Sequence, residues 1–155
     1  EAASGFIAVG MHSSEVNTIV KLKADGTQEW ATQCTDCGEF TSVATSTDKT
    51  EFATTGHCQY DVSKTDKTGC LATPGTGSSW SGIDGTVSYF NSAGQKQWTK
   101  RYPTPEASVT LINDHRVVYE ECWSIASTSD GGYVLGCGSG THCNEAPSQW
   151  SSLCT

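Results

Sequence analysis

Apolar and polar residues alternate over short stretches of this chain, as in residues 18–22 and 86–90. A period of two is typical of β-strands that bury one face. Turn-forming residues, mainly Gly, Asp and Ser, separate these stretches. Short alternating segments divided by turns predict an all-β protein with antiparallel sheets.

Two blocks of this pattern recur along the chain. Residues 18–26 and 86–94 each alternate, enter a turn that ends in Gly26 or Gly94, and are followed four residues later by Trp30 or Trp98. The glycine supplies the positive φ of a hairpin loop, and the tryptophan on the returning strand packs across the pair. Because their placement is periodic, both tryptophans are predicted to lie in the core.

A second block completes a repeat of four strands. Residues 42–48 match residues 124–130, and each block leads through a turn into another apolar strand, at 51–56 and 133–136. A third copy of that last strand opens the chain at residues 5–10. Four short strands per unit are typical of a β-propeller blade.

We place unit one at about residues 5–48 and unit two at about 51–130, with insertions at about 57–84 and 102–121; a third unit starts at about 132 and runs to 155. A closed propeller needs at least about four blades, and this count gives about two plus one strand. The chain is therefore expected to be a fragment, to complete its sheets with other copies, or to form an open two-sheet structure. Its first residue is Glu rather than Met, which also favours a processed or excised product.

The repeat resembles a known family. Residues 129–136 resemble the S-D-G-G-Y-I-V-A-G signature of secreted propeller-like repeats, and residues 19–30 resemble the K-L-D-x-x-G-x-x-x-W half of the same repeat. The resemblance covers about two thirds of the chain and implies a propeller-like fold. It implies no catalytic residue, because propellers host binding, structural and catalytic roles alike.

An even number of cysteines in an acidic, Gly- and Ser-rich chain predicts disulfides and an extracellular location. The cysteines are Cys34, Cys37, Cys58, Cys70, Cys122, Cys137, Cys143 and Cys154. Proximity along the chain favours Cys58–Cys70 and Cys137–Cys143. A zinc site is the alternative, since Cys34-x-x-Cys37 precedes His57 and Cys58, but no known ligand spacing is completed. A redox role for Cys34 and Cys37 is disfavoured because that motif belongs at a helix start.

The net charge of the chain disfavours some classes of binding partner. Nine basic residues against 17 acidic ones give a net charge of −8, which disfavours nucleic acid and anionic lipid. Apolar runs are far shorter than the roughly 20 residues that cross a bilayer. No cofactor motif was found. The expected partners are other copies of the chain or neighbouring repeats at bare strand edges, and glycans.

Candidate binding residues are few. His12, His57 and His142 follow equivalent strands and could meet in a metal or anion site, or be ordinary loop histidines. Trp80 and Trp150 lie in Ser/Gly-rich stretches and could stack on a sugar ring, or fold into small local cores. No catalytic residue is predicted.

Three functions are consistent with the sequence. The first is a non-catalytic extracellular structural or assembly module, as a subunit of a larger assembly or filament. The second is a carbohydrate- or protein-binding propeller module, and the third is a secreted propeller hydrolase or lyase. The open edges and the lack of a catalytic constellation in the sequence favour the first.

Overall fold

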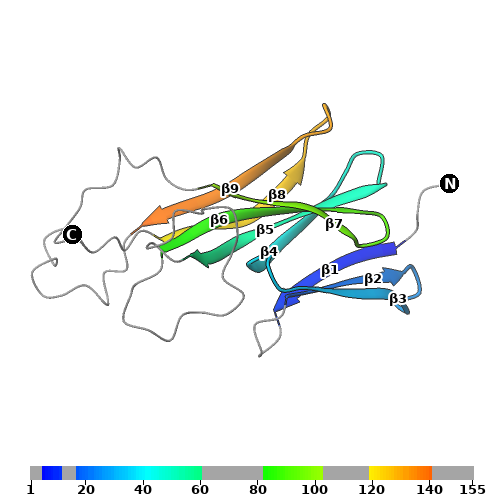
Figure 1. Cartoon of the computed structure of the whole chain (residues 1–155). Coiled ribbons are helices and arrows are strands. Elements are labelled where there is room, and N and C mark those ends of the chain that lie inside the picture. Colours follow the sequence, from blue (N-terminus) through cyan, green and yellow to red (C-terminus); the bar gives the residue numbers. More distant parts are fainter. Residues whose placement is uncertain (1–4, 12–16, 61–81, 103–118, 141–155) are drawn as a thin grey trace, which may run out of the picture.

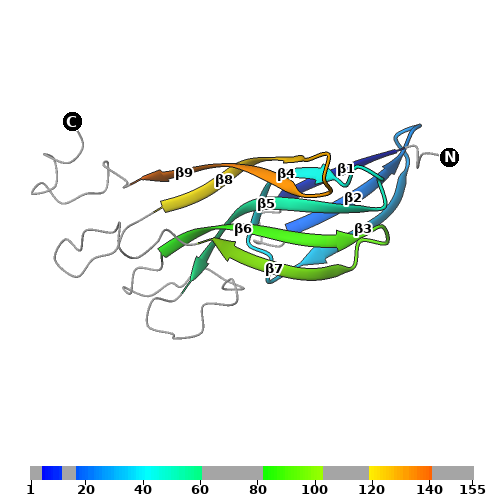
Figure 2. The same cartoon turned by 90° about the horizontal axis from the view of Figure 1, so that it is seen from above.

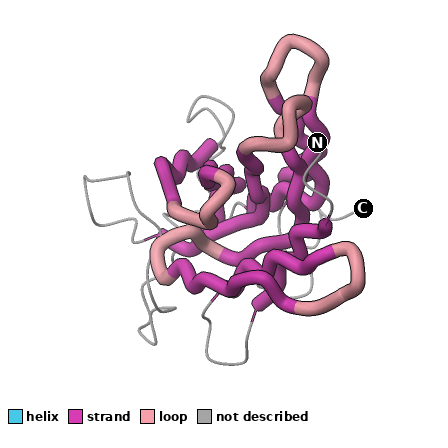
Figure 3. The backbone as a smooth tube through the Cα atoms, turned by 90° about the vertical axis from the view of Figure 1, so that its right-hand side faces the viewer, coloured by secondary structure: helices cyan, strands magenta, loops and turns pink. Residues whose placement is uncertain are grey.

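The computed structural model describes residues 5–11, 17–60, 82–102 and 119–140, which form nine strands and their turns (Figure 1). The strands are β1 (Gly5–Met11), β2 (Asn17–Lys23), β3 (Gln28–Cys34), β4 (Glu39–Thr45), β5 (Glu51–Tyr60), β6 (Gly82–Asn91), β7 (Lys96–Tyr102), β8 (Tyr119–Ser127) and β9 (Tyr133–Gly140). The described residues contain no helix (Figure 3), and so none that could span a membrane. The predicted all-β class is confirmed.

The described strands form two sheets, and all but one of their pairings are antiparallel. β1, β2 and β3 form the first sheet in that order. In the second, β4, β5, β6 and β7 each pair with the next strand along the chain. β8 and β9 form a hairpin that joins β6 through one parallel bridge, between Ile83 and Tyr119. The described strands do not close into a ring.

The meander β4–β7 is the middle of three layers (Figures 1 and 2). Successive side chains of a strand point to opposite faces, so Phe52 and Ala53 of β5 face different ways. Phe52 packs in a cluster with Ile19 of β2, whereas Ala53 packs with Ile125 of β8. The sheet β1–β3 therefore covers one face of the meander, and the hairpin β8–β9 covers the other.

Aromatic rings fill the first of these two cores. Phe52 and Phe90 are 2% and 1% exposed and stack with their ring centroids 5.0 Å apart. Trp30 reaches across from β3 and stacks on Phe52 at 6.2 Å. Because offset aromatic pairs add to the burial of their apolar area, this stack helps to hold the first sheet on the second.

The two predicted hairpins are present. Gly26 and Gly94 have φ of 83° and 76° and end the turns after β2 and β6. Trp30 lies opposite Lys21, and Trp98 lies opposite Tyr89, on which it stacks at 5.2 Å. The glycine turn and the returning tryptophan are therefore placed as the repeat predicts.

The exposure of Trp98 shows that the prediction of two core tryptophans was wrong for this residue. Trp30 is half-buried against the first core, but Trp98 is 37% exposed. Trp98 lies on the same side of the middle layer as Tyr89, and on that side β8 packs against β4, β5 and β6. Trp30 instead faces the middle layer, where its ring stacks on Phe52 and lies close to Gly94, so it is better covered.

The disulfides correct a second prediction. Cys137 bonds to Cys122, which lies directly opposite it on β8, and not to Cys143. Cys34 bonds to Cys37. Cys58 is also disulfide-bonded, and its predicted partner, Cys70, lies outside the described residues.

Strand boundaries also differ from those predicted. β5 continues to Tyr60 and β6 starts at Gly82, so the ladder runs into both ends of the predicted 57–84 insertion. β4, placed in unit one from the sequence, pairs with β5 rather than with β3. The four-stranded meander therefore begins at β4, one strand earlier than unit two of the sequence repeat.

Candidate functional site: the layer junction and the outer faces

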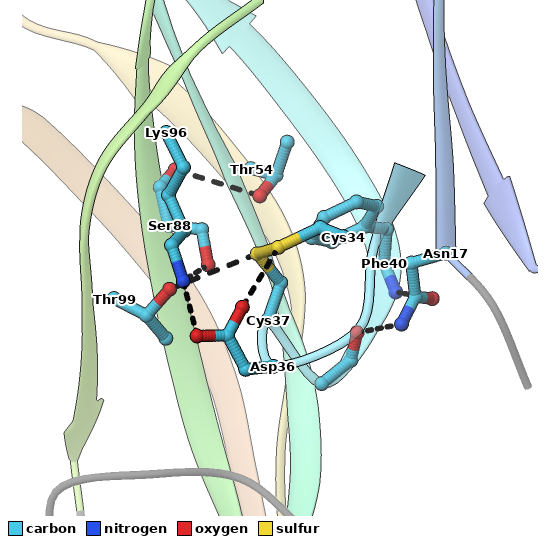
Figure 4. The surroundings of a disulfide bond; sticks show 10 residues. Asn17, Cys34, Asp36, Cys37, Phe40, Thr54, Ser88, Lys96 and Thr99 are labelled. Atoms are coloured by element: carbon cyan, nitrogen blue, oxygen red, sulfur yellow. Dashed lines mark hydrogen bonds and ion pairs between the residues drawn. A yellow bond between two sulfur atoms is a disulfide. The ribbon is translucent and has the colours of Figure 1, made fainter. Parts of the chain in front are cut away.

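The Cys34–Cys37 disulfide marks the passage of the chain from the first sheet to the second (Figure 4). Cys34 ends β3, and Cys37 precedes the turn at Gly38 that enters β4. The two cysteines are 6% and 0% exposed. A buried cross-link at this point fixes the conformation of the short connection between the two sheets.

The Asn17 side chain holds the same turn from β2. Its amide nitrogen donates to the Gly38 carbonyl, and its Oδ1 accepts from the Phe40 backbone N–H at 3.2 Å (Figure 4). Asn17 is 4% exposed, so these bonds satisfy a buried polar group. Together with the disulfide, Asn17 fixes where the second sheet starts.

Asp36 and Thr99 complete the surroundings of this disulfide. The Lys96 ammonium donates to Asp36 Oδ2, and Asp36 Oδ1 lies 3.4 Å from Cys34 Sγ. Thr99 Oγ1, on β7, lies 3.7 Å from Cys37 Sγ. These contacts tie the cross-link to β7 as well as to β3 and β4.

The Cys34, Asp36 and Cys37 side chains could hold a metal by geometry alone, since their ligand atoms lie within 4.8 Å of one another. A metal binds the thiolate form of cysteine, and both sulfurs are here in a disulfide. The pair joins the end of a strand to a turn and is buried, unlike the accessible pair at a helix start in thiol oxidoreductases. The arrangement is therefore that of a structural cross-link.

The predicted histidine site can be followed at His57. Its Nε2 lies 3.1 Å from Glu39 Oε2, across the β4–β5 pair. His12 and His142 lie outside the described residues, so a shared site of the three histidines stays a prediction. Trp80 and Trp150 also lie outside the described residues, and their role in sugar binding stays a prediction too.

An open hollow of about 200 Å³ lies between β1 and the β4–β5 turn, lined in part by Phe6, Lys21 and Glu51. Lys21 pairs with Glu29 at 3.1 Å, and Glu51 accepts a hydrogen bond from the Tyr89 hydroxyl. That bond, with burial and the nearby carboxylate charge, raises the pKa of Tyr89 to about 12. Lys21 and Glu51 at the hollow are thus engaged in contacts between strands.

Among the described residues, five large apolar side chains are exposed; Trp98 and Tyr102 lie on β7 of the middle layer, and the other three lie on the two outer layers. Phe6 of β1 is 63% exposed, Trp123 of β8 is 63% exposed, and Val134 of β9 is 56% exposed. The Trp123 indole donates to Glu121 at 2.7 Å, which holds the ring on the surface. The sequence pattern does not predict a role for Trp123, which lies one position before the recurring block 124–130.

The registers show that these exposed residues occupy repeated positions. Phe6 pairs with Leu22 as Phe52 pairs with Phe90, and both hairpins shift register at the same place, just before Leu22 and Phe90. Phe6 is thus the counterpart of Phe52 in the layer before.

The same equivalence links β4–β5 to β8–β9. Ala44 pairs with Ala53, and Ala126 pairs with Val134, one step after the pairs made by Val43 and Ile125. Val134 is therefore the counterpart of Ala53, which is fully buried against β8. The chain repeats positions that it buries in one layer and exposes in another.

Neither protein-family models nor curated proteins gave a match to this chain.

Proposed function

We propose that this chain is a non-catalytic, extracellular structural module whose propeller-like layers stack to build a larger assembly. The observation that carries the proposal is the repetition of the same apolar positions, buried between layers inside the chain and exposed on its outer layers. A surface that repeats a buried interface is suited to receive a further layer.

The propeller-like description is supported by the order of the strands. β4 to β7 form a four-stranded antiparallel meander, as in a propeller blade. β1–β3 match its last three strands, and β8–β9 match its first two, in both register and turn chemistry. On this proposal the chain contains one whole blade between parts of two others.

The extracellular location is supported by the cross-links. Cys34–Cys37 and Cys122–Cys137 join neighbouring segments of the chain. Such bonds persist in oxidising compartments and are rare where thiols are kept reduced.

A structural role is also supported by how the described charged groups are used. Lys21, Lys96 and His57 each lie against a carboxylate of another segment. Asp48 and Asp130 accept hydrogen bonds inside hairpin turns, which lower the pKa of each carboxyl group. These groups order strands and turns rather than converge on a cleft.

Sedimentation velocity of the oxidised chain over a wide range of concentrations tests the proposal. A structural assembly module should self-associate as its concentration rises, and more strongly at physiological salt, since its net charge of −8 opposes contact between copies at low salt. A chain that stays a monomer at its solubility limit would contradict an assembly role.

A further inference from the structure

The exposed side of the hairpin β8–β9 repeats the side of β4–β5 that the chain itself covers. Ala53 is fully buried under the hairpin, and its counterpart Val134 is 56% exposed. Ala44 is half-buried in the same core, and its counterpart Ala126 is exposed. We call the surface formed by Val134, Ala126 and Trp123 the back face.

We assign Trp123 to the back face because β4 and β8 have a β-bulge at equivalent positions. β4 and β8 each carry one extra residue at the same point of their ladders, Thr41 and Trp123. The Thr41 hydroxyl donates to the Cys122 carbonyl in the next layer at 2.5 Å. The position that Trp123 occupies is thus one from which a side chain reaches the following layer.

The exposed side of β1–β2 repeats the side of β5–β6 that packs on the first sheet. Ile7 and Val9 point into the first core, so Phe6 and Ala8 point the other way. Phe6 is the counterpart of Phe52, which is 2% exposed because the first sheet packs on it. We call the surface formed by Phe6, Ala8, Val20 and Leu22 the front face.

We infer that a second copy of this chain docks its front face on the back face of the first, head to tail. The inference rests on the proposed assembly function and names its partner and contact surfaces. Within one chain, surfaces equivalent to these two faces already meet twice, where β4–β7 packs on β1–β3 and where β8–β9 packs on β4–β7. The docked copy continues that stacking with the same kind of surface.

This arrangement differs from a symmetric dimer, because two different surfaces meet. Head-to-tail contacts of this kind build rings or filaments, depending on the rotation between copies. They also predict that a chain with one damaged face still binds through the other.

Two single substitutions separate the faces. Phe6→Glu places a charge on the front face, and Val134→Glu places one on the back face. Both residues are more than half exposed, so the chain tolerates the change. Ala93→Glu, in the exposed β6–β7 turn and on neither face, is the control with the same added charge.

Sedimentation velocity of each variant and of mixtures gives the result. Phe6→Glu and Val134→Glu should each lose self-association by at least about tenfold, since docking would bury an unpaired carboxylate. Ala93→Glu should associate like the unmodified chain. An equal mixture of the two face variants should form a dimer, because one copy keeps its back face and the other keeps its front face.

Three outcomes would overturn the inference. Face variants that associate like the unmodified chain would place the contact elsewhere, for example at strand edges. A mixture that stays monomeric would rule out head-to-tail pairing. Loss of association in Ala93→Glu as well would show a general charge effect. These outcomes all require that the unmodified chain self-associates. If the unmodified chain is a monomer, that result contradicts the proposed function instead.

Discussion

The turn at Gly94 offers a sharp test of how the first two layers pack. Gly94 has a φ of 76°, and a Cβ added there would lie 2.7 Å from Trp30 Cζ3 and 2.8 Å from its Cη2. Gly94→Ala therefore has two costs. A left-handed backbone costs a non-glycine residue about 1–2 kcal/mol, and displacing the packed ring costs about 1–3 kcal/mol more. We expect a total loss of about 2–5 kcal/mol in the free energy of unfolding.

Two other hairpin glycines are matched controls for the backbone cost. Gly26 and Gly131 have φ of 83° and 87°, and no atom lies within 4 Å of a Cβ built on either. Their alanine variants should lose about 1–2 kcal/mol each. Urea unfolding of the oxidised chains, followed by circular dichroism, measures all three variants under one condition.

A double-mutant cycle isolates the contact between the layers. Trp30→Leu removes the ring that the new methyl group would strike, so Gly94→Ala should cost less in that background. The reasoning would be refuted if Gly94→Ala costs no more than the controls, or costs the same with Trp30 and with Leu at position 30. Either result would mean that the β6–β7 turn does not lie over Trp30.

Three further predictions concern the hydroxyl of Tyr89 and the cross-strand disulfide. The pKa of Tyr89 is raised from 10.0 to about 12, so the protonated hydroxyl stabilises the fold fully below pH 10, and this contribution is lost as the pH rises toward 12. Tyr89→Phe should therefore flatten the fall in thermal stability over that pH range. An unchanged profile would assign the fall to other groups. Replacing Cys122 and Cys137 together by alanine should cost about 3 kcal/mol, the chain-entropy value for their separation of 15 residues. Because Cys137 is exposed, mild reduction with alkylation and mass spectrometry should label this pair before the buried Cys34–Cys37 pair; the reverse order would contradict the burial.

Some features of the chain follow from local sequence. The alternation in residues 18–22 and 86–90 predicts strands because the period of two is a property of the extended backbone itself. Gly26 and Gly94 predict hairpin turns because a positive φ is easy for glycine and costly for other residues. These are interactions between near neighbours, so a single sequence carries them.

The candidate surfaces show where local reasoning ends. Trp30 and Trp98 occupy the same place in the repeat, but whether each is covered depends on the layer that packs above it. Trp123 lies in a recurring strand, and its exposure depends on the face that strand presents. Neither property is set within the segment that carries the residue.

The cysteines show the same division between local and tertiary information. Their even number predicted disulfides, but spacing along the chain favoured Cys143 as the partner of Cys137. In the fold, the β8–β9 ladder places Cys122 directly opposite Cys137, and a disulfide requires that proximity in space.

By itself, the sequence determined the strands, their turns and the repeat, because each depends on backbone preferences over a few residues. Only the tertiary structure decided that β4 leaves the first sheet to begin the second, and which apolar positions are buried between layers. Those outcomes depend on contacts between segments far apart in the chain. The same contacts distinguish Phe52, which is buried between layers, from its counterpart Phe6, which remains open to a partner.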